Sequence, residues 1–174
     1  MPITVNGTAI KKVVCNGVNI SKVVANGVTV WTAFDGNLVT TTASQWTTSV
    51  VDWASVSSLT TNPIQFYVDS TAESVAGVGY AKCNVALDLS QYTSVTIKGI
   101  CYNRGLRNCI GSIVNASGGE IVRLFTISDD GYTKTINTTV DLKNYSQTGY
   151  VRLAIEAKGL NTGLYINLNT LQFT

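Results

Sequence analysis

Residues that commonly carry out catalysis are scarce in this chain of 174 residues. It contains no histidine, which excludes a Ser-His-Asp triad, a histidine general base and a histidine metal ligand. The ten acidic side chains show no spacing that selects a catalytic carboxylate pair. We therefore expect that the protein is not an enzyme and that it holds neither a cofactor nor a metal ion.

Four cysteines are the remaining reactive side chains, and no two of them have the C-x-x-C spacing typical of zinc and redox sites. The first residues, Met1 to Gly7, lack a charged stretch followed by an apolar one, so we expect no signal peptide and reduced thiols. Reduced cysteines are usually buried as small apolar groups. An alternative is that Cys101 and Cys109 face each other across a hairpin and oxidise after cell lysis.

Ligand recognition suits the remaining residue types better, because a Tyr or Trp ring can stack on a sugar while amide and guanidinium groups bind its hydroxyls. The polar segment 102–108 is expected to be a loop, and loops often carry binding residues. Its candidate ligand-binding residues are Tyr102, Asn103, Arg104 and Arg107. The alternative is that this segment is an ordinary solvated turn.

Four more side chains could contact a sugar. Tyr132 and Arg123 are candidates by residue type alone. Trp46 and Trp53 are also candidates, but we expect both to fill the core or to close one end of the fold.

The amino-acid composition excludes several classes of protein. Hydrophobic residues make up 45% of the chain, enough for a sizeable core, whereas charged residues make up only 13%, against a typical value of about 25%. Twelve basic and ten acidic residues leave a net charge of +2. The basic residues are scattered, which excludes an electrostatic nucleic-acid partner. The apolar runs are too short to span a bilayer, so we expect no membrane insertion.

The chain opens with a ten-residue repeat, in which Asn-Gly recurs at Asn6-Gly7, Asn16-Gly17 and Asn26-Gly27. Asn-Gly is the strongest short-range signal for a β-hairpin, because a type I′ turn needs positive φ at both central residues. Each pair is therefore predicted to be a tight turn between short strands. The polar pairs midway, Lys11-Lys12 and Ser21-Lys22, mark either the opposite turns of a meander or the solvent side of longer strands.

Residues 1–33 are expected to form an arm of β-hairpins. An isolated two-stranded ribbon is marginal in water, so its apolar side chains need a partner surface. We predict that this arm attaches the protein to a larger particle; the alternative is that the hairpins extend the main sandwich. The residues predicted to make the attachment are Asn6, Gly7, Ile10, Val14, Asn16, Gly17, Ile20, Val24, Asn26, Gly27 and Trp31.

Residues 37–174 are predicted to form one antiparallel β-sandwich. Short apolar runs alternate with Gly-, Asn- and Asp-containing turns at spacings near 8–12 residues, as in sandwiches and barrels. The expected fold class is therefore all-β, a jelly-roll-like antiparallel sandwich preceded by the short hairpin arm. The expected strands are residues 64–68, 78–88, 94–102, 109–115, 121–127, 133–140, 150–157 and 164–173.

Two segments of the predicted sandwich are similar to each other. Each begins with Asp-Leu, at Asp88 and at Asp141, continues through a polar pair to Tyr92 or Tyr145, and leads into an alternating strand. We expect the aspartate to bind nearby backbone amides and the tyrosine to pack on the rim of the core. The segment would then position successive long strands across the two sheets.

This pattern, together with the closing segment 163–174, resembles jelly-roll domains of the carbohydrate-binding-module type, which are common in tail, baseplate and fibre proteins of bacteriophages. The repeat in residues 3–31 is similar to short N-terminal segments of phage minor structural proteins. Jelly rolls of the resembling family often hold Ca²⁺, for which Asp129 and Asp130 are the candidates. Two aspartates before Gly131 are, however, more typical of a turn.

The resemblance implies an accessory structural protein of a phage virion, assembled in the host cytoplasm. Its arm would bind other virion proteins, and its sandwich would be displayed on the tail, the baseplate or the capsid surface. The resemblance also implies a homo-oligomer, with a trimer as one arrangement. The alternative function is a carbohydrate-binding module or adhesin that recognises glycans on the host cell surface.

Overall fold

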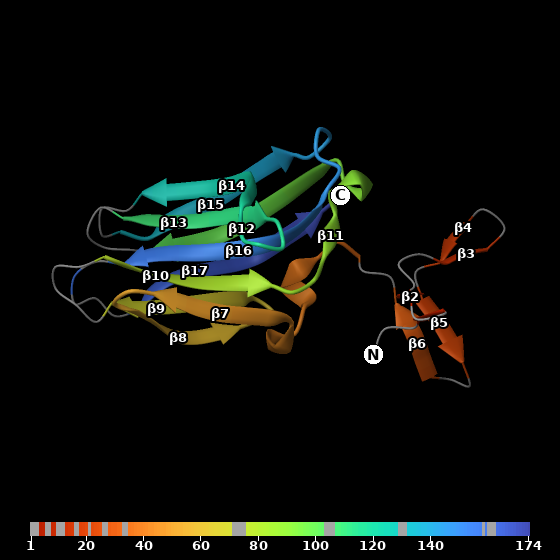
Figure 1. Ribbon diagram of the computed structural model, residues 1–174, viewed down its shortest axis with the longest axis horizontal. Helices are drawn as coiled ribbons and strands as arrows, with labels where there is room; N and C mark the ends of the chain where they lie inside the picture. The colour runs from red at the N-terminus through yellow and green to blue at the C-terminus, as the bar shows by residue number, and fades with distance from the viewer. Residues whose placement is uncertain are drawn as a thin grey trace. The chain divides into compact units, whose positions relative to one another are not determined.

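The computed structural model consists of β-strands joined by turns (Figure 1). It describes residues 4–5, 8–9, 13–15, 18–20, 22–25, 28–32, 35–70, 76–102, 107–128, 132–157, 159 and 163–174. The chain divides into two compact units, Met1–Gly36 and Asn37–Thr174. Helices in the described residues are short 3₁₀ turns, and none has the length and apolarity needed to cross a membrane.

The first unit contains three antiparallel hairpins, one at each Asn-Gly. The two residues that flank the dipeptide are paired in every hairpin, as Cys15 is with Val18. These pairs lie on either side of each Asn-Gly, while the Asn-Gly dipeptides themselves lie outside the described residues. The strands are β1 (Thr4–Val5), β2 (Thr8–Ala9), β3 (Val13–Cys15), β4 (Val18–Ile20), β5 (Lys22–Ala25) and β6 (Val28–Thr32).

Four of the predicted attachment residues lie in these strands: Val14 in β3, Ile20 in β4, Val24 in β5 and Trp31 in β6. The others lie outside the described residues; they are Asn6, Gly7, Ile10, Asn16, Gly17, Asn26 and Gly27.

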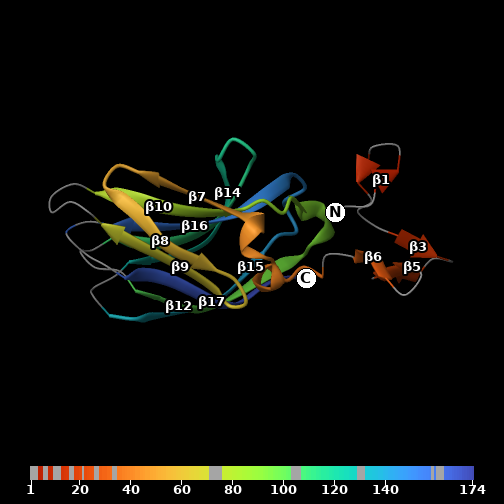
Figure 2. The ribbon, with the colours of Figure 1, turned by 90° about the horizontal axis from the view of Figure 1, so that it is seen from below.

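The second unit is a sandwich of two antiparallel sheets, which confirms the predicted all-β fold (Figures 1 and 2). Sheet I has the order β14-β13-β16-β10-β7, with β11 paired to β16, and sheet II has the order β15-β12-β17-β9-β8. The strands of sheet I are β7 (Trp46–Val51), β10 (Gly77–Cys83), β11 (Leu87–Asp88), β13 (Asn108–Val114), β14 (Glu120–Ser128) and β16 (Thr148–Ala157). Those of sheet II are β8 (Ala54–Thr60), β9 (Ile64–Ser70), β12 (Ser94–Tyr102), β15 (Lys134–Asp141) and β17 (Leu164–Phe173).

Two predictions of strand boundaries are corrected by the structure. The predicted strand 78–88 is two strands, β10 and β11, separated by residues 84–86. β7 and β8 have no counterpart among the predicted strands, because these edge strands are rich in Thr and Ser and lack an alternation of apolar and polar residues. Short 3₁₀ turns also occur, at η1 (Leu38–Thr40), η2 (Ala43–Gln45) and η3 (Leu89–Gln91).

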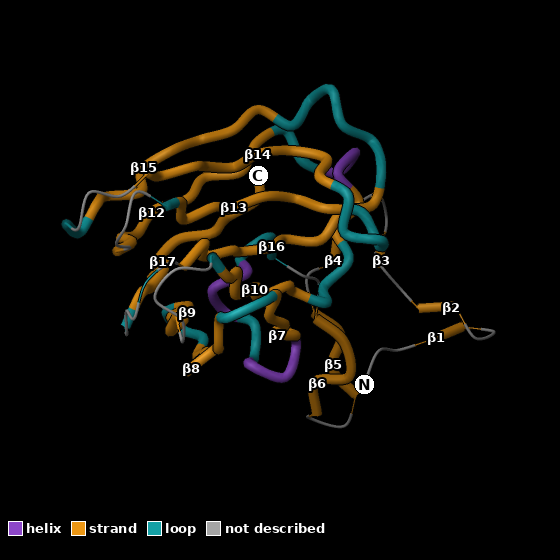
Figure 3. The backbone as a smooth tube through the Cα atoms, turned by 60° about the vertical axis from the view of Figure 1, so that its left-hand side comes forward, coloured by secondary structure: helices purple, strands orange, loops and turns teal. Residues whose placement is uncertain are grey.

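The core lies between the two sheets, which face each other as layers in Figure 3. In β9 and β10 every second residue is buried, as expected for strands that pack one face on the opposite sheet. Phe66, Leu153 and Phe173 are among the largest fully buried side chains. Burial of a side chain of this size contributes roughly 1.5–3 kcal/mol.

The two Asp-Leu segments connect the sheets as predicted. Asp88 Oδ1 accepts a hydrogen bond from the backbone N–H of Ser90 at 3.2 Å, and Asp141 Oδ1 accepts one from Lys143 at 2.8 Å. In both segments the leucine is fully buried and the tyrosine packs against the core. The chain crosses from sheet I to sheet II after Asp88, and from sheet II to sheet I after Asp141.

Three cysteine side chains are described, and all three are buried: Cys83, Cys101 and Cys109. This confirms the prediction of small apolar groups for these positions. The alternative, a hairpin that brings Cys101 against Cys109, is wrong. Cys101 lies in β12 of sheet II and Cys109 in β13 of sheet I, so the two strands do not pair.

Burial raises the pKa of the Cys83 thiol from 9.0 to about 11, and a backbone hydrogen bond with Val85 offsets part of the shift. The unfolded chain therefore loses this proton first, so the unfolding free energy should fall as the pH rises from about 9 to about 11. We expect Cys83→Ala to reduce this fall by up to about 3 kcal/mol. Urea unfolding of both proteins on either side of this pH range measures the difference, and parallel pH profiles would contradict the assignment.

Candidate ligand-binding face

Three tyrosines, Tyr67, Tyr102 and Tyr165, lie side by side on the outer face of sheet II. Side chains alternate between core and solvent along a strand, so these rings point outward while adjacent residues such as Phe66 and Ile166 are buried. The register pairs Tyr165 of β17 with Tyr67 of β9 on one side and with Tyr102 of β12 on the other. We call these three residues the tyrosine row.

The rings of the tyrosine row touch one another. The ring centres of Tyr67 and Tyr165 are 5.6 Å apart with planes inclined by 47°, and those of Tyr102 and Tyr165 are 5.8 Å apart at 30°. Such pairs contribute about 0.5–1.5 kcal/mol beyond the burial of their area. The hydroxyls of Tyr165 and Thr133 share a hydrogen bond of 3.1 Å. All three rings are half-buried, so part of each remains accessible to a ligand.

Asn167 lies one step further along the same face, where it pairs with Gln65 of β9 and Ile100 of β12. Its Nδ2 donates to the hydroxyl of Tyr67 at 3.5 Å. Its Oδ1 is buried and has no hydrogen-bond partner among the described residues. A buried acceptor without a partner costs about 1–3 kcal/mol, which a hydrogen bond from a ligand hydroxyl would offset.

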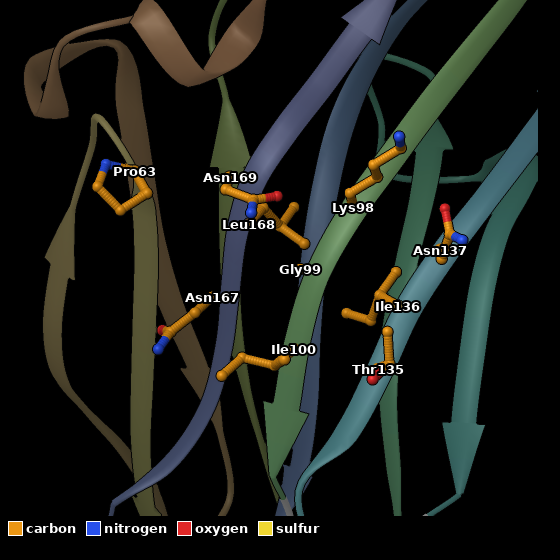
Figure 4. A pocket seen from close by; sticks show the side chains of 10 residues that line it. All are labelled: Pro63, Lys98, Gly99, Ile100, Thr135, Ile136, Asn137, Asn167, Leu168 and Asn169. Carbon is orange, nitrogen blue, oxygen red and sulfur yellow. The ribbon is translucent and has the colours of Figure 1, made fainter.

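Asn167 borders a hollow of about 440 Å³, in which side chains from β12, β15 and β17 meet (Figure 4). The pairing of β12 with β17 shifts register here, between Lys98 and Gly99. Gly99 is needed because a Cβ would lie only 2.9 Å from the Cα atom of Leu168 on the neighbouring strand. The lining residues are Pro63, Lys98, Gly99, Ile100, Thr135, Ile136, Asn137, Asn167, Leu168 and Asn169.

The outer face of sheet I also carries tyrosines, but cations of the chain itself lie over them. The Arg152 guanidinium is 5.2 Å from the ring centre of Tyr80, and the Lys82 ammonium is 4.8 Å from that of Tyr150. The same cations donate to carbonyl groups of the β13–β14 loop at 3.1 and 3.4 Å. Lysine and arginine side chains of the chain itself therefore occupy the faces of these rings, so sheet II is the better candidate for a ligand face.

The predicted ligand loop contributes one residue to the tyrosine row, Tyr102. Arg107 is half-buried just before β13, and Asn103 and Arg104 lie outside the described residues. Sequence reasoning missed Tyr67 and Tyr165. The alternation of the strands predicted at 64–68 and 164–173 marks both as outward positions, but it does not show that the two strands are neighbours.

Trp46 is 6% exposed, and its indole Nε1 donates to Thr41 Oγ1 at 2.8 Å, which confirms the predicted core position. Trp53 does not fill the core, because it is 54% exposed in the turn between β7 and β8. Tyr132 is 71% exposed, and Lys134 lies 5.9 Å from its ring centre. Neither belongs to the tyrosine row.

The charged candidates do not gather at this face either. Arg123 forms an ion pair of 2.8 Å with Glu120 on β14 of sheet I. Asp129 and Asp130, the calcium candidates, lie outside the described residues. Within the described part of the chain, no group of three or more Cys, Asp or Glu side chains could hold a metal ion.

No family model and no curated protein matches the sequence. Among solved structures, a family 11 carbohydrate-binding module from Clostridium thermocellum, in complex with a β-1,3-1,4-mixed-linked tetrasaccharide, is 14% identical; the match has a TM-score of 0.44 and covers 79% of this chain and 94% of that one. The K1 cleaved adhesin domain of Lys-gingipain from Porphyromonas gingivalis is 14% identical, with a TM-score of 0.47 and coverages of 80% and 94%. The enzymatically active domain of tailspike protein 4 from bacteriophage CBA120 is 9% identical, with a TM-score of 0.48 and coverages of 82% and 21%. All three TM-scores are below 0.5, so these likenesses carry no argument about function.

Proposed function

We propose that the protein binds glycans, without cleaving them, through the tyrosine row and the adjoining hollow of sheet II. The observation that carries this proposal is the contact of three tyrosine rings beside Asn167, whose buried Oδ1 has no partner among the described residues. A sugar has apolar C–H faces and a rim of hydroxyls, so it is recognised by aromatic surface next to hydrogen-bonding groups. Both kinds of group lie here on one sheet.

In this proposal the aromatic and the polar side chains of the face contact different parts of the sugar. The rings of the tyrosine row pack against the C–H faces of successive sugar units. Asn167 Oδ1 accepts a hydrogen bond from a sugar hydroxyl, and Lys98 and Asn137 donate to sugar oxygens in the hollow. Strand pairing holds the backbone of all these residues in place before the ligand arrives, which lowers the entropic cost of binding.

Isothermal titration with a panel of bacterial and plant polysaccharides tests this proposal. We expect at least one polysaccharide to bind with an affinity in the micromolar to millimolar range. Tyr80→Ala, on the outer face of sheet I, is the control and should bind as the wild type does. The proposal is wrong if no polysaccharide of the panel gives heat in titration or retards the protein in an affinity gel.

A second role, attachment to a larger particle, is favoured by the three hairpins of the first unit. Each is a two-stranded sheet, which is marginal by itself in water. A surface that adds a strand or covers apolar side chains would stabilise them. We propose that residues 1–33 attach the protein to an assembly such as a phage virion, where the sandwich would be an accessory component that displays its glycan-binding face.

Deleting residues 2–31 is expected to leave a folded sandwich, because the second unit contains its own core. The shortened protein should bind glycan as the full chain does but no longer incorporate into particles. Quantitative mass spectrometry of purified particles measures its occupancy, which should fall to background. Normal occupancy of the shortened protein would contradict the attachment role of the hairpins.

A further inference from the structure

Three of the four strands at the edges of the described sandwich carry features that hinder pairing with another chain. β14 contains Glu120 and Arg123 and is irregular at two points of its pairing with β13. β15 contains Lys134 and Asp141, and β8 shifts register against β9. Charges and bulges of this kind protect sheet edges from unwanted β-pairing.

The fourth edge strand, β7, has none of these features. Its sequence, Trp-Thr-Thr-Ser-Val-Val, contains no charge, proline or glycine, and its register against β10 is unbroken from Trp46 to Val51. Residues 47–51 are all exposed. Most of them are Thr or Val, which favour strands. Val50 and Val51 are 47% and 49% exposed, and Trp53 in the following turn is 54% exposed. An uncharged, regular and partly apolar edge is suited to pairing with a further strand.

We propose that β7 pairs with β7 of a second copy of this chain, antiparallel across a two-fold axis, so that sheet I continues from one copy into the other. A strand without charges is compatible with itself, because self-pairing brings no like charges together. A strand that carried charges of one sign, by contrast, would repel its own copy at this axis.

Side chains of β7 alternate between the two faces of sheet I, and this alternation limits the registers in which two copies of β7 can pair. Residues opposite one another must lie on the same face, so an outward residue of one copy must meet an outward residue of the other. The register that uses the whole exposed strand places Ser49 opposite Ser49 of the second copy. Thr47 then faces Val51, and Thr48 faces Val50, which gives β-branched cross-strand pairs on both sides of the axis.

The dimer would also strengthen glycan binding, and this part of the inference rests on the proposed function. An axis through Ser49 runs perpendicular to sheet I, so sheet II of each copy faces the same side. Two glycan-binding faces would then contact one polysaccharide surface together, and such bivalency raises avidity by about 10²–10⁴-fold. The pairing itself is independent of glycan binding and is tested without any glycan.

Cysteine cross-linking measures both the dimer and its register. The full chain with Cys15→Ser retains only the buried thiols Cys83, Cys101 and Cys109. In that background, Ser49→Cys places two thiols opposite each other at a Cα separation of about 4.5–5.5 Å, within the range of a disulfide. We expect covalent dimers as the main product of mild oxidation.

Thr47→Cys is the matched control, since it lies on the same strand and the same face. In the proposed register it is roughly 14 Å from its equivalent in the second copy, too far for a disulfide. It should therefore remain monomeric on oxidation, whereas an equal mixture of Thr47→Cys and Val51→Cys should cross-link. Equal cross-linking of Ser49→Cys and Thr47→Cys would overturn the register.

Sedimentation velocity over a range of concentrations up to about 100 µM measures the dimer without a covalent bond, because a contact of this size is expected to be weak. We expect a wild-type dimer whose dissociation constant rises at least tenfold in Ser49→Lys, where like charges meet at the axis. Thr139→Lys, on the edge strand β15, should leave the dimer unchanged. A wild-type monomer throughout, or a dimer unaffected by Ser49→Lys, would overturn the proposal.

Discussion

Replacing Tyr165 by alanine is expected to weaken glycan binding by a factor of about 30 or more, while the sandwich remains folded. Tyr165 is the middle ring of the tyrosine row, with ring centres 5.6 Å from Tyr67 and 5.8 Å from Tyr102. Its loss removes one contact surface for sugar and leaves the two outer rings without lateral support. Central aromatic contacts are typically worth about 2 kcal/mol or more, which corresponds to this change in the dissociation constant measured by titration.

Tyr165→Phe separates the ring from its hydroxyl. It removes only the hydrogen bond with Thr133, so we expect a loss of affinity of no more than about twelvefold, since one hydrogen bond contributes about 0.5–1.5 kcal/mol. A cooperative urea unfolding transition in each variant would show that both are folded. Wild-type affinity in Tyr165→Ala would show that the tyrosine row is not the ligand surface.

Leu142→Ala is expected to lower the unfolding free energy by about 2–5 kcal/mol. Leu142 is fully buried at the corner where the chain leaves sheet II for sheet I. Its N–H donates to the carbonyl oxygen of Thr93 at 2.8 Å, and its own carbonyl accepts from the N–H of Tyr145 at 2.9 Å. These bonds hold the backbone in place, so the cavity left by the side chain cannot easily collapse. Urea unfolding measures the loss.

The same chain offers a repeat of this experiment and a control. Leu89→Ala, at the equivalent place in the other Asp-Leu segment, should destabilise the protein to a similar extent. Lys143→Ala, next to Leu142 but exposed, should change the unfolding free energy by less than about 0.5 kcal/mol. Equal effects of Leu142→Ala and Lys143→Ala would show that the corner is not part of the core.

Local signals in the sequence predict much of the sandwich. The observed bounds of β12 and β17 match the predicted segments 94–102 and 164–173, because alternation and flanking turn residues mark both ends of such strands. The Asp-Leu corners are predictable for the same reason: the aspartate binds an amide two residues away in its own segment.

Contacts between distant segments could not be predicted in this way. Tyr67, Tyr102 and Tyr165 come from three strands, and only the order β12-β17-β9 makes them neighbours. Strand order depends on how the whole chain packs, which alternation within one strand does not encode. The polar loop at 102–108 therefore drew attention to Tyr102 but not to its two partners. β7 and β8 were not predicted because exposed edge strands need no apolar face and therefore show no alternation of apolar and polar residues.

The position of the bound ligand tests the central claim most directly. Backbone amide chemical shifts of the full chain, recorded by NMR during titration with the polysaccharide fragment that binds best, report that position residue by residue. We expect the largest changes at the tyrosine row and at Asn167 on sheet II, with the amides around Tyr80 on sheet I unmoved. Saturable binding whose largest changes lie on sheet I would contradict the assignment of the ligand face.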